Sequence, residues 1–120
     1  MTDGRRRLGE FGERLAVNHL EARGYRIIRR NARLSNTGEV DIVALDGDTL
    51  VFVEVRTRRG ERGLAADSIA GRKAQRMLRH AENYEADEYE ARRIDLIVVD
   101  LDGSGRVLGV DHVISAVTPD

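Results

Sequence analysis

The sequence predicts an α/β domain in which a mixed β-sheet is flanked by helices. Three observations support this fold class. Two stretches with helical spacing of apolar residues are separated by strand-like stretches, residues 38–45 and 50–57 form a hairpin pattern, and residues 93–101 form an apolar strand after the second helix. A strand that follows a crossover helix tends to lie parallel in the same sheet. We therefore expect a three-stranded antiparallel meander, a crossover helix and further strands.

The first half of the chain predicts one helix and the three strands of the meander. Residues 8–23 place apolar side chains mostly three or four positions apart, and Gly24 is a suitable helix C-cap. Residues 25–33 are strand-like, and the turn residues Ser-Asn-Thr-Gly at 35–38 lead into the hairpin. The polar residues 1–7 are expected to form a disordered tail.

The second half predicts the crossover helix and the remaining strands. The expected elements are a charged loop at 58–64, a helix at 70–88, a buried strand at 93–101, a turn at 102–105 and a last strand at 106–113. One domain over residues 8–117, followed by a tail at 118–120, accounts for this pattern.

The composition indicates one ordinary domain with a polar surface. The chain has 120 residues, of which 41% are hydrophobic and 34% are charged. The absence of cysteine excludes disulfides and thiolate metal sites. The apolar runs are far shorter than the roughly 20 residues that a membrane span needs, and the polar start shows no secretory signal. We therefore expect a cytoplasmic protein with no membrane partner.

The turn between the two hairpin strands fixes which side chains should face each other. A loop of even length centred on Gly47-Asp48 pairs residues whose numbers sum to 95. This register places Asp41 opposite Glu54 and Glu39 opposite Arg56. Directly opposed Cβ atoms lie about 5 Å apart, and two ionised carboxylates at that distance repel by roughly 3 kcal/mol at an effective dielectric near 20. A proton or a cation is therefore expected there, and a divalent metal bound by carboxylates is the leading candidate.

The alternative register is less favourable for the apolar residues of the hairpin. The even register gives one wholly apolar face, whereas an odd loop sets Asp41 against a valine and shifts one strand's faces relative to its partner's. The residues of that apolar face are Val40, Ile42, Ala44, Val51, Val53 and Val55.

The charged residues around the hairpin follow a recognisable pattern. Asp41, twelve intervening residues and Glu54-x-Arg56 form its centre, with Glu13 on the first helix and Lys73 near the start of the second. The chain resembles the YraN family of small bacterial proteins, which is similar to restriction-endonuclease-like nucleases and Holliday-junction resolvases of the PD-(D/E)XK type. The resemblance covers about residues 8–115 and is carried by Gly12-Glu13, 30–33, 38–41, 52–58, Lys73 and 93–95.

The resemblance implies a restriction-endonuclease-like fold and a metal-dependent nuclease that hydrolyses phosphodiester bonds in DNA. It implies Asp41 and Glu54 as metal-binding acids, with Glu13 as a helix-borne acid and Mg²⁺ or Mn²⁺ as the ion. Arg56 stands where the family pattern has lysine, and arginine does not release its proton near neutral pH. A charge-stabilising role remains open to Arg56, and Lys73 is the candidate for the missing ammonium.

Several alternatives remain open from the sequence. Asp41 and Glu54 could form a structural ion cluster with arginines. The second hypothesis for the function is a non-catalytic nucleic-acid-binding module that keeps the fold, and Arg56 is the reason for it. A partner-binding scaffold is the third. A resolvase-like role would imply a homodimer. Arg30, Arg33 and Arg58 are the candidate contacts to DNA.

The remaining polar residues predict structural roles. Asp95 begins a buried strand, where pairing with arginine or capping is favoured over catalysis. His19, His80 and His112 fall on separate elements without ligand spacing, so a histidine metal site is not expected. His19 and His80 are expected on helix surfaces.

Overall fold

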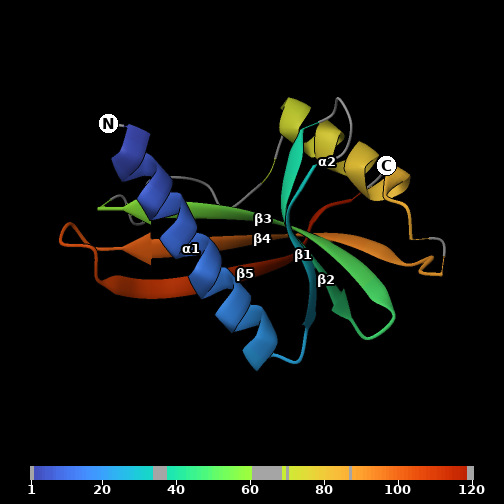
Figure 1. Ribbon diagram of the computed structural model, residues 1–120, viewed down its shortest axis with the longest axis horizontal. Coiled ribbons are helices and arrows are strands. Elements are labelled where there is room, and N and C mark those ends of the chain that lie inside the picture. The colour runs from blue at the N-terminus through green and yellow to red at the C-terminus, as the bar shows by residue number, and fades with distance from the viewer. Residues whose placement is uncertain (1, 34–37, 61–68, 70, 87, 119–120) are drawn as a thin grey trace.

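A computed structural model describes residues 2–33, 38–60, 69, 71–86 and 88–118 of the chain (Figure 1). These residues contain two helices and five strands. In chain order they are α1 (Thr2–Ala22), β1 (Arg26–Arg33), β2 (Glu39–Asp46), β3 (Thr49–Arg59), α2 (Gly71–Asn83), β4 (Arg92–Leu101) and β5 (Val107–Val117).

The five strands form one mixed sheet in the order β1-β2-β3-β4-β5. β1, β2 and β3 are antiparallel neighbours, β3 and β4 are parallel, and β5 pairs antiparallel with β4. The meander, the crossover helix and the parallel strand after it confirm the predicted fold class. Among the described residues no helix is long and apolar enough to cross a membrane.

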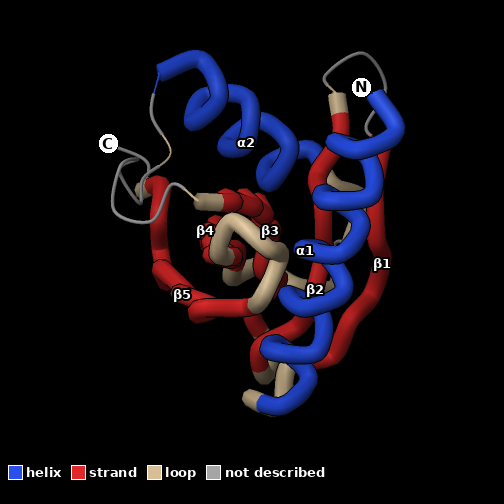
Figure 2. Tube along the Cα trace, turned by 90° about the vertical axis from the view of Figure 1, so that its left-hand side faces the viewer, coloured by secondary structure: helices blue, strands red, loops and turns tan. Residues whose placement is uncertain are grey.

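The sheet is strongly twisted. In Figure 1, β1 and β2 run steeply across the view while β4 and β5 extend to the left, and in Figure 2 β3 and β4 are seen nearly end-on beside the upright β1 and β2. Right-handed twist is the normal outcome of strand sterics. Its consequence here is that β2 and β3 run together near their turn and then diverge.

The hairpin has the predicted register near its turn. The paired residues run from Asp46↔Thr49 to Ile42↔Val53, and each pair sums to 95. The described pairing ends there, so Asp41 and Glu54 lie just beyond it.

The expected position of Glu39 opposite Arg56 is wrong. Glu39 pairs instead with Arg33 of β1, with Arg33 Nη2 3.2 Å from Glu39 Oε1. The reason is that β2 stays with β1 after it has left β3.

The two helices cover opposite faces of the sheet. On one face, Ala16 and Leu20 of α1 pack against a core that includes Ile42, Val51 and Val53. The other face carries α2 and has its own buried cluster. That cluster includes Met77 and Ala81 of α2 with Val43, Leu50, Phe52, Ile94 and Leu96. Alternate residues of β3 therefore serve the two cores, as a strand buried on both faces requires.

Val40 departs from the predicted apolar face. It is buried with Val43 and Phe52 in the α2 core, although Ile42 and Ala44 belong to the α1 core. The expectation that Val40 shares their face is wrong, because β2 diverges from β3 beyond Ile42, and Val40 is buried in the α2 core together with its β1 partner Ala32.

The ends of both helices differ from the expected ones. α1 begins at Thr2 and not at Leu8, so residues 2–7, expected as a disordered tail, are helical. Three arginines directly before Leu8 explain the extension, since arginine is a strong helix former. α2 ends at Asn83 and not at residue 88. At this end of the helix, the guanidinium of Arg92 donates hydrogen bonds to the carbonyl oxygens of Ala81 and Tyr84. These bonds satisfy carbonyls that a helix end leaves without intrahelical partners.

Candidate active site between α1, β2 and β3

Asp41 lies where the pairing of β2 with β3 ends. Its Oδ2 accepts a hydrogen bond of 2.8 Å from the backbone N–H of Val55. The carboxylate thus takes the place of the strand carbonyl that would otherwise accept from β3. The local divergence of the strands is stabilised by this bond, and it holds an acidic side chain inside the opening.

Glu54 enters the same opening from β3. Glu54 is buried, with 8% of its surface exposed, and its Oε2 forms an ion pair with Nζ of Lys73. Lys73 is half-exposed near the start of α2. The structure therefore brings Lys73 to the acids, although 18 residues separate it from Glu54 in the sequence.

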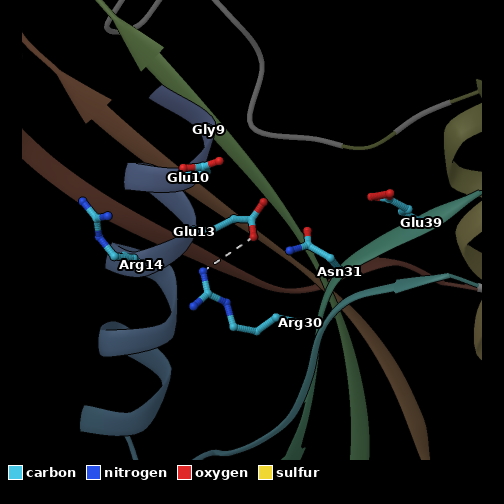
Figure 3. Close-up of a pocket in the computed structure, with 7 residues that line it drawn as sticks. All are labelled: Gly9, Glu10, Glu13, Arg14, Arg30, Asn31 and Glu39. Atoms are coloured by element: carbon cyan, nitrogen blue, oxygen red, sulfur yellow. Dashed lines mark ion pairs between the residues drawn. The ribbon is translucent and has the colours of Figure 1, made fainter. Parts of the chain in front are cut away.

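Glu13 reaches the site from α1 because the helix approaches β3 very closely. A Cβ added at Gly12 would lie 1.8 Å from Oγ1 of Thr57, so glycine is required for this approach. The Glu13 carboxylate lies 3.8 Å from Nη2 of Arg30 and accepts a hydrogen bond from the side chain of Asn31. Figure 3 shows Glu13 between these two residues of β1.

Glu13 links two adjoining open clefts. One has a volume of about 430 Å³ and is lined by Leu8, Gly9, Glu13, Asp41, Glu54, Val55 and Thr57. The second has a volume of about 770 Å³ and is lined by Gly9, Glu10, Glu13, Arg14, Arg30, Asn31 and Glu39 (Figure 3). The first cleft contains all three acids that the sequence singled out as metal ligands.

The electrostatics of the cleft disfavour its own negative charge. Burial, and next the carboxylate of Glu54, raise the pKa of Asp41 to about 7, against the lowering effect of the Val55 hydrogen bond. Glu13 raises it further, while the ammonium of Lys73 lowers it. Burial also raises the pKa of Glu13, and Arg30 partly offsets this. A carboxyl group that titrates near neutral pH in a cleft is a common property of functional sites.

The donor set of the cleft fits a hard dication. It offers carboxylate oxygens on adjacent elements, which are the ligands that Mg²⁺ prefers, and added positive charge would remove the repulsion between Asp41 and Glu54. Within the described residues, however, no three acidic, histidine or cysteine side chains already stand in a ligating arrangement. Two carboxylates supplemented by water match the usual Mg²⁺ coordination, in which several waters are kept.

The arginines predicted to contact DNA have different environments. Arg33 is 80% exposed, and Arg30 is 43% exposed beside Glu13. Arg58 is buried, and its guanidinium forms a two-pronged pair with Asp100, at 2.8 Å from Nε to Oδ1 and 3.1 Å from Nη2 to Oδ2. Arg58 is therefore removed from the candidate DNA contacts and acts as a structural cross-link between β3 and β4. Arg56 is partly buried on β3 and has interactions of its own.

The histidines and Asp95 form no part of this cleft. Asp95 is fully buried and pairs with Arg93, at 2.9 Å from Nε to Oδ1, and with Nε2 of His112 at 2.8 Å. The predicted pairing of Asp95 with arginine is thus confirmed. His80 is 1% exposed, so its expected surface position is wrong. The buried face of α2 includes His80 because that residue lies three positions after Met77, and residues three apart share one face of a helix.

Two elements of the site could not be identified from sequence motifs. The Val55 N–H that holds Asp41 is a backbone group and leaves no signal in the sequence. Asn31 lies next to a candidate arginine, and its backbone has a φ of 52°, a left-handed conformation that asparagine adopts more readily than most residues. The presence of an asparagine within the predicted strand at 25–33 is the sequence feature that could have indicated an irregular backbone conformation there.

Comparison with known proteins identifies relatives over the whole chain. Residues 12–99 match the uncharacterised protein family UPF0102. A UPF0102 protein of Pelotomaculum thermopropionicum is 45% identical over 116 residues, covering 93% of this chain and 96% of the relative. One from Chloroflexus aurantiacus is 45% identical over 124 aligned positions and covers both chains completely, and one from Dehalococcoides mccartyi is 47% identical over 105, covering 84% of this chain and 86% of the relative. The chain belongs to the UPF0102, or YraN-like, family.

Proposed function

We propose that this protein is a metal-dependent nuclease that hydrolyses phosphodiester bonds in DNA, with branched and other repair or recombination intermediates as the first substrates to test. One observation carries the proposal. Asp41 and Glu54 line one cleft where β2 and β3 diverge, and the pKa of Asp41 is raised to about 7. The mixed sheet with a helix on each face also fits the restriction-endonuclease-like fold that the resemblance implies.

Asp41 and Glu54 would hold the dication, and Glu13 is the third acid of the same cleft. When bound, Mg²⁺ or Mn²⁺ would lower the pKa of a bound water and stabilise charge developing on the phosphate. Asp41 must lose its proton to act as a ligand, so metal binding is expected to release a proton at neutral pH. The hydrogen bond from Val55 orients the Asp41 carboxylate before any ligand arrives.

Lys73 is the cation best placed to contact the reacting phosphate. Its Nζ pairs with Glu54, which lines the cleft, and its side chain is half-exposed, so it can donate hydrogen bonds to a phosphoryl oxygen. Arg56 is the second candidate, because a guanidinium binds phosphate through two parallel hydrogen bonds. Neither residue is assigned proton transfer from water, since Arg56 stays protonated and Lys73 is paired with a carboxylate.

The proposal extends to the setting of the protein. A nuclease acting on chromosomal DNA would work in the cytoplasm, and symmetric cleavage of a branched substrate would require a homodimer. Gel-filtration with light scattering in the presence of a four-way junction tests the dimer directly.

Cleavage of labelled DNA tests the nuclease activity. Wild-type protein should cut a four-way junction or a single strand when Mg²⁺ or Mn²⁺ is present and not when a chelator is added. Asp41→Asn and Glu54→Gln should each lower the rate by at least about a hundredfold, within the range that electrostatic stabilisation contributes. Asp48→Asn and Glu82→Gln make the same chemical changes at exposed positions and should cut normally. Equal cleavage by all four variants would show that the activity does not come from this cleft.

A non-catalytic DNA-binding module is the second candidate. Two observations favour it: arginine occupies the family's lysine position at Arg56, and Glu54 already has Lys73 as its counter-ion. Arg56→Lys separates the two candidates. Cleavage that appears or rises in Arg56→Lys supports a nuclease site weakened by arginine, whereas metal-independent DNA binding without cleavage in both proteins supports the binding module.

A further inference from the structure

Three arginines form a row on the exposed side of α2. Arg72, Arg76 and Arg79 are four and three residues apart, which places them on one face of an α-helix, and all three are exposed. Met77 and Ala81 of the same helix are buried in the core. Arg72, Arg76 and Arg79 are called the α2 arginine row below.

The α2 arginine row is not balanced by acidic residues on its own helix. The first turn of α2 contains no acid, and in the sequence the first acid after Gly71 is Glu82. Within the described part of the chain, none of the three arginines takes part in an ion pair. Like charges three and four residues apart oppose helix formation, and cations in the first turn oppose the helix dipole. This face of α2 therefore carries positive charge that its own helix does not balance, which suits it to an anionic partner.

The α2 arginine row lies beside the candidate active site. Lys73, next to Arg72, pairs with Glu54 of β3. Arg76 passes Gly38, the residue before β2, since a Cβ added there would lie 3.9 Å from Cδ of Arg76. Figure 1 shows α2 near the ends of β1 and β2 that carry this part of the chain. The first arginine of the row is thus the chain neighbour of the lysine that pairs with Glu54, one of the residues lining the cleft that contains Asp41.

The length of the row matches a nucleic-acid strand. Arg79 lies seven positions after Arg72, which is about 10 Å along a helix. A nucleic-acid strand in a duplex carries one phosphate per roughly 3.4 Å of axis, so the row spans about three phosphates. Arginine binds phosphate through a planar fork of donors, which suits it to this role better than lysine.

We propose that the α2 arginine row binds the phosphate backbone of one nucleic-acid strand and holds it beside Asp41 and Glu54. The inference rests on the proposed function, because it states how that site would hold its substrate. Of the DNA contacts expected from the sequence, only Arg58 is buried, and the proposal adds the exposed face of α2 to the exposed Arg30 and Arg33.

Salt-dependent binding of a fluorescent single-stranded oligonucleotide tests the inference. Binding is measured by anisotropy with chelator present and with Asp41→Asn in every protein, so that no cleavage occurs. The row variant carries Arg72→Gln, Arg76→Gln and Arg79→Gln. A control variant carries Arg23→Gln, Arg26→Gln and Arg106→Gln, which remove the same charge from other exposed positions.

The row variant should lose about two units from the slope of log K against log salt, because each phosphate contact to a single strand contributes about 0.7. At about 0.1 M salt this corresponds to binding roughly a hundredfold weaker than that of the parent protein. The control variant should keep the parent slope. Glutamine is a good helix former, so the row variant should unfold at the same temperature as the parent or higher.

Three results would overturn the inference: equal slopes for the row and control variants, no oligonucleotide binding by the parent protein at low salt, or a row that is needed for a polyglutamate peptide and not for DNA. The last result would assign the row to an acidic protein partner. Row-dependent binding without any cleavage by wild-type protein would support this inference and contradict the nuclease. Cleavage that does not depend on the row would do the opposite.

Discussion

Replacing Asp41 with asparagine should stabilise the protein at neutral and alkaline pH. The pKa of Asp41 is raised from 3.8 to about 7 by burial and by Glu54. A carboxyl group with a raised pKa contributes its full stability below pH 3.8, where both states are protonated. It loses that contribution as the pH rises from 3.8 to about 7, because the unfolded state then releases its proton while the folded state still holds one.

The size of this effect follows from the two pKa values. At about 1.4 kcal/mol per pH unit, the difference between 3.8 and about 7 corresponds to a cost of about 4 kcal/mol at pH 8. Asparagine carries no charge and can still accept the hydrogen bond from Val55. The variant should therefore gain up to about 4 kcal/mol of unfolding free energy at pH 8, a large share of the 5–15 kcal/mol typical of a domain.

Urea denaturation followed by circular dichroism measures this difference across the pH range. The free-energy gain of Asp41→Asn over wild type should be near zero at pH 4, grow with pH, and level off above pH 7. Asp48→Asn, at the exposed hairpin turn, controls for the chemical change itself. A gain that does not change with pH, or a loss of stability at pH 8, would refute the account of the cleft.

Three further predictions concern the neighbours of the site. Arg58→Met should cost about 3–5 kcal/mol in urea denaturation, because it leaves Asp100 buried without its counter-ion, and adding Asp100→Leu should recover most of the loss. Gly12→Ala should cost about 1–3 kcal/mol through overlap with Thr57, and a double-mutant cycle with Thr57→Ala should show partial recovery; independent effects would contradict the close approach of α1. Lys73→Met should raise the pKa of Asp41 above about 7, since the ammonium lowers that pKa, and carbon-detected NMR of the Asp41 carboxyl group measures the change; an unchanged titration would separate Lys73 from the acids.

The hairpin shows why much of the fold follows from local sequence. The turn at Gly47-Asp48 and the alternation of valines fix the register of β2 and β3 without reference to the rest of the chain. The approach of Asp41 to Glu54 follows from the same register. Where the pairing ends could not be derived, because it depends on the twist of the whole sheet and on β2 remaining with β1.

The roles of individual arginines were the least predictable part of the site. The sequence predicts Arg58 in a charged, glycine-containing loop. In the structure Arg58 is buried because it pairs with Asp100, which lies 42 positions later in the chain. Arg33, the last residue of β1, likewise meets Glu39 only because β1 pairs with β2. Long charged side chains find their partners through tertiary structure, and the sequence spacing of those partners carries little information.

Calorimetric titration of Mn²⁺ or Mg²⁺ into wild-type protein and into Asp41→Asn is the most direct test of the proposed dication site. The wild type should give a saturable isotherm whose heat depends on the buffer, because Asp41 releases a proton on binding, and whose affinity rises with pH up to about 7. Asp41→Asn should give no saturable heat. Identical isotherms for the two proteins, or no binding by the wild type, would contradict a metal held between β2 and β3.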